Sequence, residues 1–315
     1  MNTTMVNPRD AYGETLVRLG EQYPNLVVLD ADLSKSTRTI LFKKKYPQRF
    51  FEMGIAEANM VSVAAGLASC GKIPFVSTFA VFATGRVYDQ VRIDVAYSKA
   101  NVKIFATHGG ISVGKDGASH QMIEDLALMR VLPNMSVFAP SDGNLTRRVV
   151  ELMAQEKGPM YARVGRDALP LLYQLEDLRN ITPGKGIVLR EGSDVTLLAC
   201  GTMVEHALRA HNILEKEGVS TRVIDMFSVK PLDTALVLDC ARETNLVLTL
   251  EEHSIIGGLG GAVAEVLAEQ GTHTRFKRIG IQDMFCESGD PKDLLEKYKL
   301  NENHLVRTVH DLLKK

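Results

Sequence analysis

The sequence predicts an α/β protein built from two open, mostly parallel sheets with helices on both faces. Short apolar runs rich in β-branched residues alternate with stretches of helical periodicity along the chain. A polar connector at residues 175–186 contains Pro183 and Gly184 and interrupts this alternation. The 315 residues are 45% hydrophobic, which is enough for two cores. We therefore expect one domain at residues 1–180 and a second at residues 187–315.

In the first domain, five runs have the length and composition of strands, and the stretches between them have the apolar spacing of helices. The expected strands are residues 26–30, 75–78, 102–107, 136–139 and 160–164. The expected helices are residues 10–23, 57–70, 85–98 and 144–155. Residues 49–54 are expected to form an edge of the sheet. This alternation is typical of a parallel sheet covered by helices on both faces.

The same alternation restarts in the second domain. The expected strands are residues 194–200, 221–226, 245–250 and 275–279, and the expected helices are residues 203–217, 232–243 and 258–270. Glu251, Glu252 and His253 end one of these strands, just before the glycine-rich residues 257–261. A phosphate-binding loop would also carry a lysine or the GxGxxG spacing, and this segment has neither. We interpret its glycines as sites of close helix–strand packing.

Composition and charge argue against several classes of protein. Lys and Arg number 37 and Asp and Glu number 38, so that no nucleic-acid partner is expected. The most apolar long stretch, residues 255–268, contains Glu265 and several glycines and is too short to span a membrane. The four cysteines form no Cys-x-x-Cys pair, which is typical of a reduced, cytoplasmic protein.

Glu57 stands alone among small apolar residues at positions 53–66. A carboxylate in such surroundings is costly unless it is protonated or hydrogen-bonded to a specific partner. The simpler interpretation is a glutamate in the first turn of a helix, where the helix dipole favours it. The residues that follow favour a functional role.

Phe79 and Phe82 follow the expected strand at residues 75–78. Because the two residues are three positions apart at the start of an expected helix, their side chains lie on the same face of that helix. Most such pairs pack in a core, but a pair of this kind can also form a stacking wall for a planar heteroaromatic ring. The carboxyl ends of strands in open α/β sheets are the usual place for ligands.

A glycine-rich loop, residues 107–121, follows the next strand and carries His108, Asp116 and His120. It is either an ordinary solvated loop or one that lays imidazoles and a carboxylate against a hydroxyl-rich substrate. The spacing of the histidines fits no compact ligand pattern, so we expect no metal held by this chain. Arg9, Arg163 and Arg166 are the candidates for binding phosphate, although isolated arginines are usually surface residues.

Several motifs, in this order, resemble the C-terminal half of transketolase. They are residues 54–60 (GIAEANM), 77–82 (STFAVF), 88–90 (YDQ), 114–121 (GKDGASHQ), 140–143 (PSDG) and 230–233 (KPLD). The resemblance runs from Arg9 to the C-terminus. It implies a pyrimidine-binding domain, a transketolase C-terminal domain and thiamine diphosphate as the cofactor. The implied reaction moves a two-carbon ketol unit from a ketose phosphate to an aldose phosphate, as in the pentose phosphate pathway.

The resemblance also implies roles for residues around the cofactor. Glu57 matches the glutamate that hydrogen-bonds the aminopyrimidine ring, and it must be protonated or share a proton at neutral pH. Phe82 matches the aromatic that stacks on the pyrimidine, Phe79 lines the same pocket, and Asp32 lies near the cofactor edge. Many members carry a further tyrosine after the two phenylalanines, where this chain has ATGR at residues 83–86.

Substrate contacts follow from the same resemblance. His108 matches the histidine near the donor's terminal hydroxyl, and His120 matches a second substrate-contacting histidine. Asp116 matches the carboxylate that recognises the acceptor's hydroxyl next to the aldehyde. The implied phosphate clamp consists of Arg9, Ser36 and Arg166, with Arg163 as a competitor for the last position.

One motif of a full-length transketolase is missing. The Gly-Asp-Gly that holds the diphosphate and its magnesium occurs nowhere in the 315 residues. The resemblance therefore implies a split enzyme, in which an N-terminal partner subunit with Gly-Asp-Gly holds Mg and the diphosphate. Self-association to an α2β2 heterotetramer is expected.

Other interpretations stay open. Deoxyxylulose-phosphate synthase shares three of the motifs, but it usually has aspartate and arginine near His108. The beta subunit of 2-oxo acid dehydrogenases has the same two domains and a different histidine loop. A non-catalytic assembly subunit would not need Glu57, His108, Asp116 and His120. A flavoprotein-like binding module would leave Glu57 without a role.

Overall fold

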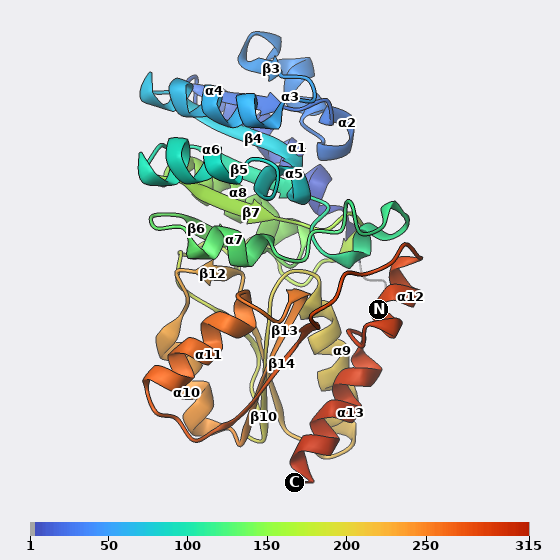
Figure 1. Ribbon diagram of the computed structural model, residues 1–315. Coiled ribbons are helices and arrows are strands. Elements are labelled where there is room, and N and C mark those ends of the chain that lie inside the picture. Colours follow the sequence, from blue (N-terminus) through green and yellow to red (C-terminus); the bar gives the residue numbers. More distant parts are fainter. Residues whose placement is uncertain (1–3, 315) are drawn as a thin grey trace.

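The computed structural model describes residues 4–314, and its strands form two large sheets and one small one. The first large sheet, in the upper part of Figure 1, has the strand order β12-β6-β7-β5-β4-β2-β3. Its strands are β2 (Leu26–Asp30), β3 (Phe50–Glu52), β4 (Ile73–Phe79), β5 (Lys103–Thr107), β6 (Ser136–Phe138), β7 (Met160–Arg163) and β12 (Ser228–Lys230). The predicted strands are all present, and the predicted edge at residues 49–54 is the edge strand β3.

Helices cover both faces of this sheet. Val27 and Val28 are neighbours on β2 and point to opposite faces, where they join different hydrophobic clusters. Helices α1 (Pro8–Gln22) and α8 (Gly143–Gln155) pack on the face of Val28, and α4 (Glu57–Ser69) and α7 (Asp125–Val131) pack on the face of Val27. The shorter helices are α2 (Ser34–Thr37), α3 (Ile40–Lys45), α5 (Ala80–Thr84), α6 (Tyr88–Gln90), η1 (Pro47–Arg49) and η3 (Ile111–Asp116).

The helix predicted over residues 85–98 differs from the structure. Its main part is η2 (Val91–Tyr97), a π-helix that follows the single turn of α6. Apolar periodicity alone does not separate a π-helix from an α-helix, because both bury one face. Val91 and Val95 are fully buried on that face.

The second large sheet, in the lower part of Figure 1, has the order β14-β13-β10-β11-β9. Its strands are β9 (Ile187–Arg190), β10 (Val195–Ala199), β11 (Thr221–Asp225), β13 (Leu246–Ser254) and β14 (Arg275–Ile281). Its helices are α9 (Met203–Lys216), α10 (Thr234–Glu243), α11 (Leu259–Glu269), α12 (Pro291–Lys297) and α13 (Glu302–Leu313). Only β9 runs antiparallel to its neighbour. The small sheet pairs β1 (Met5–Val6) with β8 (Leu169–Pro170).

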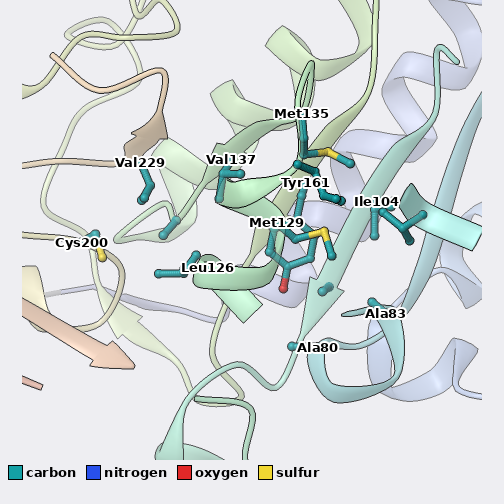
Figure 2. Packing of buried hydrophobic residues seen from close by; sticks show 14 of the residues in the cluster. Ala80, Ala83, Ile104, Leu126, Met129, Met135, Val137, Tyr161, Cys200 and Val229 are labelled. Carbon is teal, nitrogen blue, oxygen red and sulfur yellow. The ribbon is translucent and has the colours of Figure 1, made fainter. Parts of the chain in front are cut away.

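The first and second halves of the chain are joined by a shared sheet and a shared hydrophobic core. Strand β12 comes from the second half of the sequence, yet it pairs antiparallel with β6 of the first sheet. The sequence did not predict it, because three residues before Pro231 are too short a run to show a strand pattern. Figure 2 shows Leu126 and Met129 of α7 and Val137 of β6 in one hydrophobic cluster with Val229 of β12 and Cys200. The prediction of two mostly parallel sheets is confirmed, and a continuous core joins them.

Candidate active site

The candidate residues of the first domain meet at one edge of its sheet. Parallel strands place their carboxyl ends together, and in open α/β folds this edge holds ligands. Asp32 follows β2, Phe79 ends β4 and His108 follows β5, while Glu57 begins α4. Strands β2, β4 and β5 are direct neighbours in the sheet. Residues that lie far apart in the sequence therefore converge here.

Glu57 is buried, with 3% of its side chain exposed, and it has a partner that the sequence analysis did not name. Nη1 of Arg86 donates to Oε1 of Glu57 at 2.8 Å. The same guanidinium lies over the ring of Phe82, 4.0 Å from its centroid. One side chain thus contacts both groups that the resemblance assigns to the pyrimidine ring. The spacing of four residues between Phe82 and Arg86 was the only signal for it.

The aromatic pair is present, with the two rings in different surroundings. Phe79 is buried and stacks on His108, with 3.7 Å between ring centroids. Phe82 is half-buried and lies 6.0 Å from Phe79, nearly parallel to it. The ring of His120 meets Phe82 edge-on, with 5.5 Å between centroids. Phe82 is therefore the more exposed ring of the pair, with the Arg86 guanidinium over it, and Phe79 supports His108.

His108 is held in an unusual backbone conformation and in a positive field. Its φ angle is +61°, and its Nδ1 lies 2.8 Å from the hydroxyl of Thr107. Burial lowers the pKa of His108 to about 3, and the positive charges of Arg9 and Arg166 add to this effect. The imidazole is therefore neutral at physiological pH and offers a hydrogen bond rather than a charge.

Arginines gather near this imidazole. Arg9 donates through Nη1 to the carbonyl of Ser36 at 3.1 Å and through Nε to Oδ1 of Asn7 at 3.2 Å. Burial and the nearby charge of Arg38, with a further contribution from Arg166, lower the pKa of Arg9. Guanidinium groups that repel one another in this way create a favourable place for a phosphate. The sequence analysis did not single out Arg38, which pairs with Asp10.

Arg163 and Arg166, the two candidates for the last position of the phosphate clamp, differ in burial. Arg163 has 7% of its side chain exposed, and its Nη1 pairs with Oδ1 of Asp125 at 2.7 Å. Its Nη2 donates to the carbonyl of Glu252 at 2.8 Å. Arg166 is half-buried, donates to the carbonyl of Val113 at 2.9 Å and lies 3.8 Å from Oδ2 of Asp116. Both arginines therefore lie against the loop, Arg163 in the interior beside Gly109 and Arg166 at the open edge beside Asp116.

Three remaining residues lie at the surface of the same edge. The Asp116 side chain is 39% exposed, and Nδ1 of the half-buried His120 lies 2.9 Å from the hydroxyl of Ser119. Asp32 is exposed, has a φ angle of +61°, and donates its backbone N–H to Oε1 of Glu52 at 2.8 Å. Within residues 4–314, no three His, Cys, Asp or Glu side chains are grouped as metal ligands.

Comparison with known proteins identifies the two parts of this fold. Residues 4–170 match the family model described as transketolase, pyrimidine binding domain, and residues 184–305 match transketolase, C-terminal domain. These two domains together define a protein of the thiamine-diphosphate-dependent class. The chain belongs to the transketolase family.

Proteins of about the same length are described as a section, a subunit or a split-gene form of transketolase. A Methanocaldococcus jannaschii protein described as a transketolase C-terminal section is 48% identical over 98% of this chain and 96% of its own length. One of the subunits of the apulose-4-phosphate transketolase of Phocaeicola vulgatus is 37% identical over the full length of both chains. A solved structure described as a split gene transketolase, inactive beta4 tetramer, is 50% identical, covers 99% of both chains and has a TM-score of 0.89.

These comparisons confirm the resemblance to the C-terminal half of transketolase. Membership in the family also implies dependence on thiamine diphosphate. In the part of the chain that the structure describes, no helix is long and apolar enough to cross a membrane.

Proposed function

We propose that this chain is the C-terminal subunit of a two-chain transketolase that moves a two-carbon ketol unit from a ketose phosphate to an aldose phosphate. One observation carries the proposal. A buried carboxylate, Glu57, a half-buried aromatic ring, Phe82, and the cationic group of Arg9 and Arg166 meet at one sheet edge. This is the combination needed to bind an aminopyrimidine ring next to a sugar phosphate.

The residues at this edge fit the pyrimidine half of the cofactor. Glu57 is buried, which suits a proton-sharing partner of a ring nitrogen, and the aromatic ring of Phe82 lies at the same place, since Arg86 contacts both. When bound, thiamine diphosphate supplies the electron sink for breaking and forming the carbon–carbon bond. The chain's own contribution is to hold the ring, to share a proton through Glu57 and to orient the substrates.

Each substrate residue has a proposed task that fits its surroundings. His108, neutral and fixed by Phe79, hydrogen-bonds the donor's terminal hydroxyl without attracting the phosphate. Asp116, at the open edge, accepts a hydrogen bond from the acceptor's hydroxyl, and His120 is a second substrate contact. Arg9, with Ser36 beside it, and Arg166 hold the phosphate, and Asp32 lies near the cofactor edge.

A partner subunit completes the site in this proposal. The sequence contains no Gly-Asp-Gly, so we assign the diphosphate and Mg to an N-terminal partner carrying that motif. The relatives described as a C-terminal section and as one subunit of a transketolase support a separate chain. We further propose an α2β2 assembly, a cytoplasmic location, a role in pentose phosphate metabolism, and domains at residues 1–180 and 187–315.

Reconstitution tests this proposal. The chain is mixed with a Gly-Asp-Gly-bearing partner, thiamine diphosphate and magnesium, and transfer is measured with a panel of pentose phosphates and apulose 4-phosphate, the sugar in one relative's name. We expect two-carbon transfer by the mixture and none by either chain alone. Equal activity of the isolated chain would refute the split site. Absence of transfer with every sugar of the panel would refute the proposed reaction.

A further inference from the structure

We propose that residues 287–291 of the C-terminal domain position the loop that recognises the acceptor, so that this domain takes part in substrate selection. These residues precede and begin α12, which lies beside the loop after β5 in Figure 1. The proposal rests on the proposed function, and it gives the C-terminal domain a role in that reaction.

Two hydrogen bonds tie the loop to this segment. The hydroxyl of Ser288 donates to the carbonyl of Lys115 at 2.5 Å. The side-chain amide of Gln121 donates to the carbonyl of Glu287 at 3.0 Å. Lys115 directly precedes Asp116, and Gln121 directly follows His120. The two bonds therefore bracket both substrate residues of the loop.

Gln121 also forms hydrogen bonds to the earlier part of the loop, at residues 111–114. It is 5% exposed, and its Nε2 lies 3.4 Å from the carbonyl of Ile111 and 3.3 Å from that of Gly114. An amide nitrogen carries only two hydrogens, so three carbonyls share them. This one side chain joins the beginning of the loop, its end and the C-terminal segment.

The backbone of the loop lies directly against the same segment. Gly114 has a φ angle of +78°, and a Cβ added there would lie 3.2 Å from both the carbonyl oxygen of Gly289 and the ring of Pro291. Gly117 has a φ angle of +72°, and a Cβ there would lie 3.4 Å from Ser288. Glycine at these positions allows both the left-handed conformation and the close approach.

The segment is itself anchored, so it can act as a support. The hydroxyl of Tyr298 accepts from the backbone N–H of Glu287 at 3.0 Å, and Nζ of Lys297 pairs with the Glu287 carboxylate at 2.5 Å. Gly289 packs against Leu294 of α12. Without this support, Asp116 would lie on an exposed glycine-rich loop, and the entropy of ordering it would weaken acceptor binding.

Two variants and two matched controls test the proposal. Ser288→Ala removes one hydrogen bond and Gln121→Met removes the shared donor, while Ser193→Ala and Gln174→Met change exposed residues elsewhere. Hydrogen exchange of residues 111–121 is measured in the isolated chain by mass spectrometry. We expect faster exchange in both variants and wild-type exchange in both controls, because the loop loses its fastening.

Kinetics in the reconstituted complex provide the second measurement. We expect Ser288→Ala to raise the KM for the aldose acceptor about 3- to 10-fold, the range that one ordinary hydrogen bond supplies. The KM for the ketose donor should stay within about 2-fold, because His108 does not depend on this contact. Gln121→Met should have a larger effect in the same direction.

Two results would overturn the proposal. Unchanged exchange in residues 111–121 for both variants would show that the segment does not hold the loop. Equal changes in the donor and acceptor KM would show a general structural effect. If the wild-type complex transfers no two-carbon unit, the proposed function is wrong, and the exchange experiment still decides whether the segment positions the loop.

Discussion

The two sheets carry similar polar groups at their carboxyl edges but leave them in different states. In the second sheet, Glu251 near the end of β13 is fully buried. Its Oε2 accepts from the N–H of Leu259 and its Oε1 from the N–H of Gly260, both at 2.7 Å. Gly258 and Gly260 approach this carboxylate closely: a Cβ at Gly258 would overlap Oε2, and one at Gly260 would lie 3.0 Å from Oε1. Glu251 thus caps α11 and is fully used within the chain.

The next two residues of that strand are satisfied in the same way. Glu252 accepts from the hydroxyl of Thr202 at 2.6 Å and from the backbone N–H of Ser112. His253 donates from Nδ1 to the carbonyl of Ser254 at 2.7 Å and accepts at Nε2 from the N–H of Ala127 at 3.3 Å. No hydrogen-bonding capacity of this imidazole is left for a ligand. The interpretation of this segment as close packing is supported.

In the first sheet, Glu57 is buried and paired with Arg86, but other polar groups at the edge are open to solvent. Asp116 and His120 lie at an open edge, and Arg9 and Arg166 repel each other across it. The two edges contain the same types of residue, so residue type alone does not identify a site. The two buried carboxylates differ in their partners: backbone N–H groups bind Glu251, whereas the exposed side chain of Arg86 binds Glu57.

The strongest test of this contrast compares Glu57→Gln with Glu251→Gln. Glutamine keeps the size of Glu57 but cannot share a proton with a ring nitrogen, so we expect the turnover of the reconstituted complex to fall by about 10²- to 10⁴-fold. Glu251→Gln should leave turnover nearly unchanged once folded. Steady-state rates at saturating cofactor measure both, with circular dichroism as the check of folding. An unchanged rate for Glu57→Gln would make Glu57 a helix-end residue.

The next largest effect is expected for substitution of Arg9 or Arg166 and concerns the KM for phosphorylated sugars. Arg9→Gln and Arg166→Gln should each raise the KM for phosphorylated sugars about 10- to 100-fold, since a hydrogen bond to a charged group contributes about 1.5–3 kcal/mol. The KM for unphosphorylated sugars should not change. Arg275→Gln, at an exposed position of the second sheet, is the control. Equal effects on both kinds of sugar would mean that these arginines stabilise the edge rather than bind phosphate.

The sequence predicts the parts of this molecule that depend on local pattern. The fully buried run of β2 is found at its predicted bounds, and α4 begins at Glu57 as its apolar spacing indicates. The fold class and family follow from such runs and motifs. The sequence could place Glu57, His108 and Asp116 at one edge because parallel strands end together.

Contacts between distant segments could not be predicted. Arg163 and Arg166 look alike in the sequence, and only the pairing of Arg163 with Asp125 shows that it is interior. Arg86 belongs to residues 83–86, where many members of the family carry a further tyrosine. Its contact with Glu57 depends on how the start of α4 packs against the turn after α5. Strand β12 requires a partner about ninety residues earlier in the chain. Such pairings are set by packing rather than by periodicity.

The free energy of unfolding tests the role of Glu251 in the second sheet. Glu251→Gln leaves one of two buried N–H groups without its acceptor, and we expect a loss of about 1–3 kcal/mol in the free energy of unfolding. Glu265→Gln is the matched control, because its carboxylate is mostly exposed where it pairs with Arg130, and exposed pairs contribute at most about 1 kcal/mol. Urea unfolding of the two variants measures both. A similar loss for both would contradict a capping role for Glu251.

The smallest effect is expected for His108 near neutral pH. Its pKa in the folded chain is about 3, below the value of about 6.5 for an unfolded histidine. Between these two values the unfolded chain binds a proton that the folded chain does not, so the contribution to stability is complete above pH ~6.5 and is lost as the pH falls toward 3. Nuclear magnetic resonance should show no titration of the His108 ring between pH 5 and 8.

The same ring in the chain unfolded by urea is the control and should titrate near pH 6.5. A midpoint between pH 5 and 8 in the folded chain would mean that His108 becomes charged beside Arg9 and Arg166. The imidazole would then compete with these arginines for the phosphate instead of binding a hydroxyl. A neutral His108 keeps the two tasks of this edge apart, because the guanidinium groups attract the anion and the imidazole only directs a hydrogen bond.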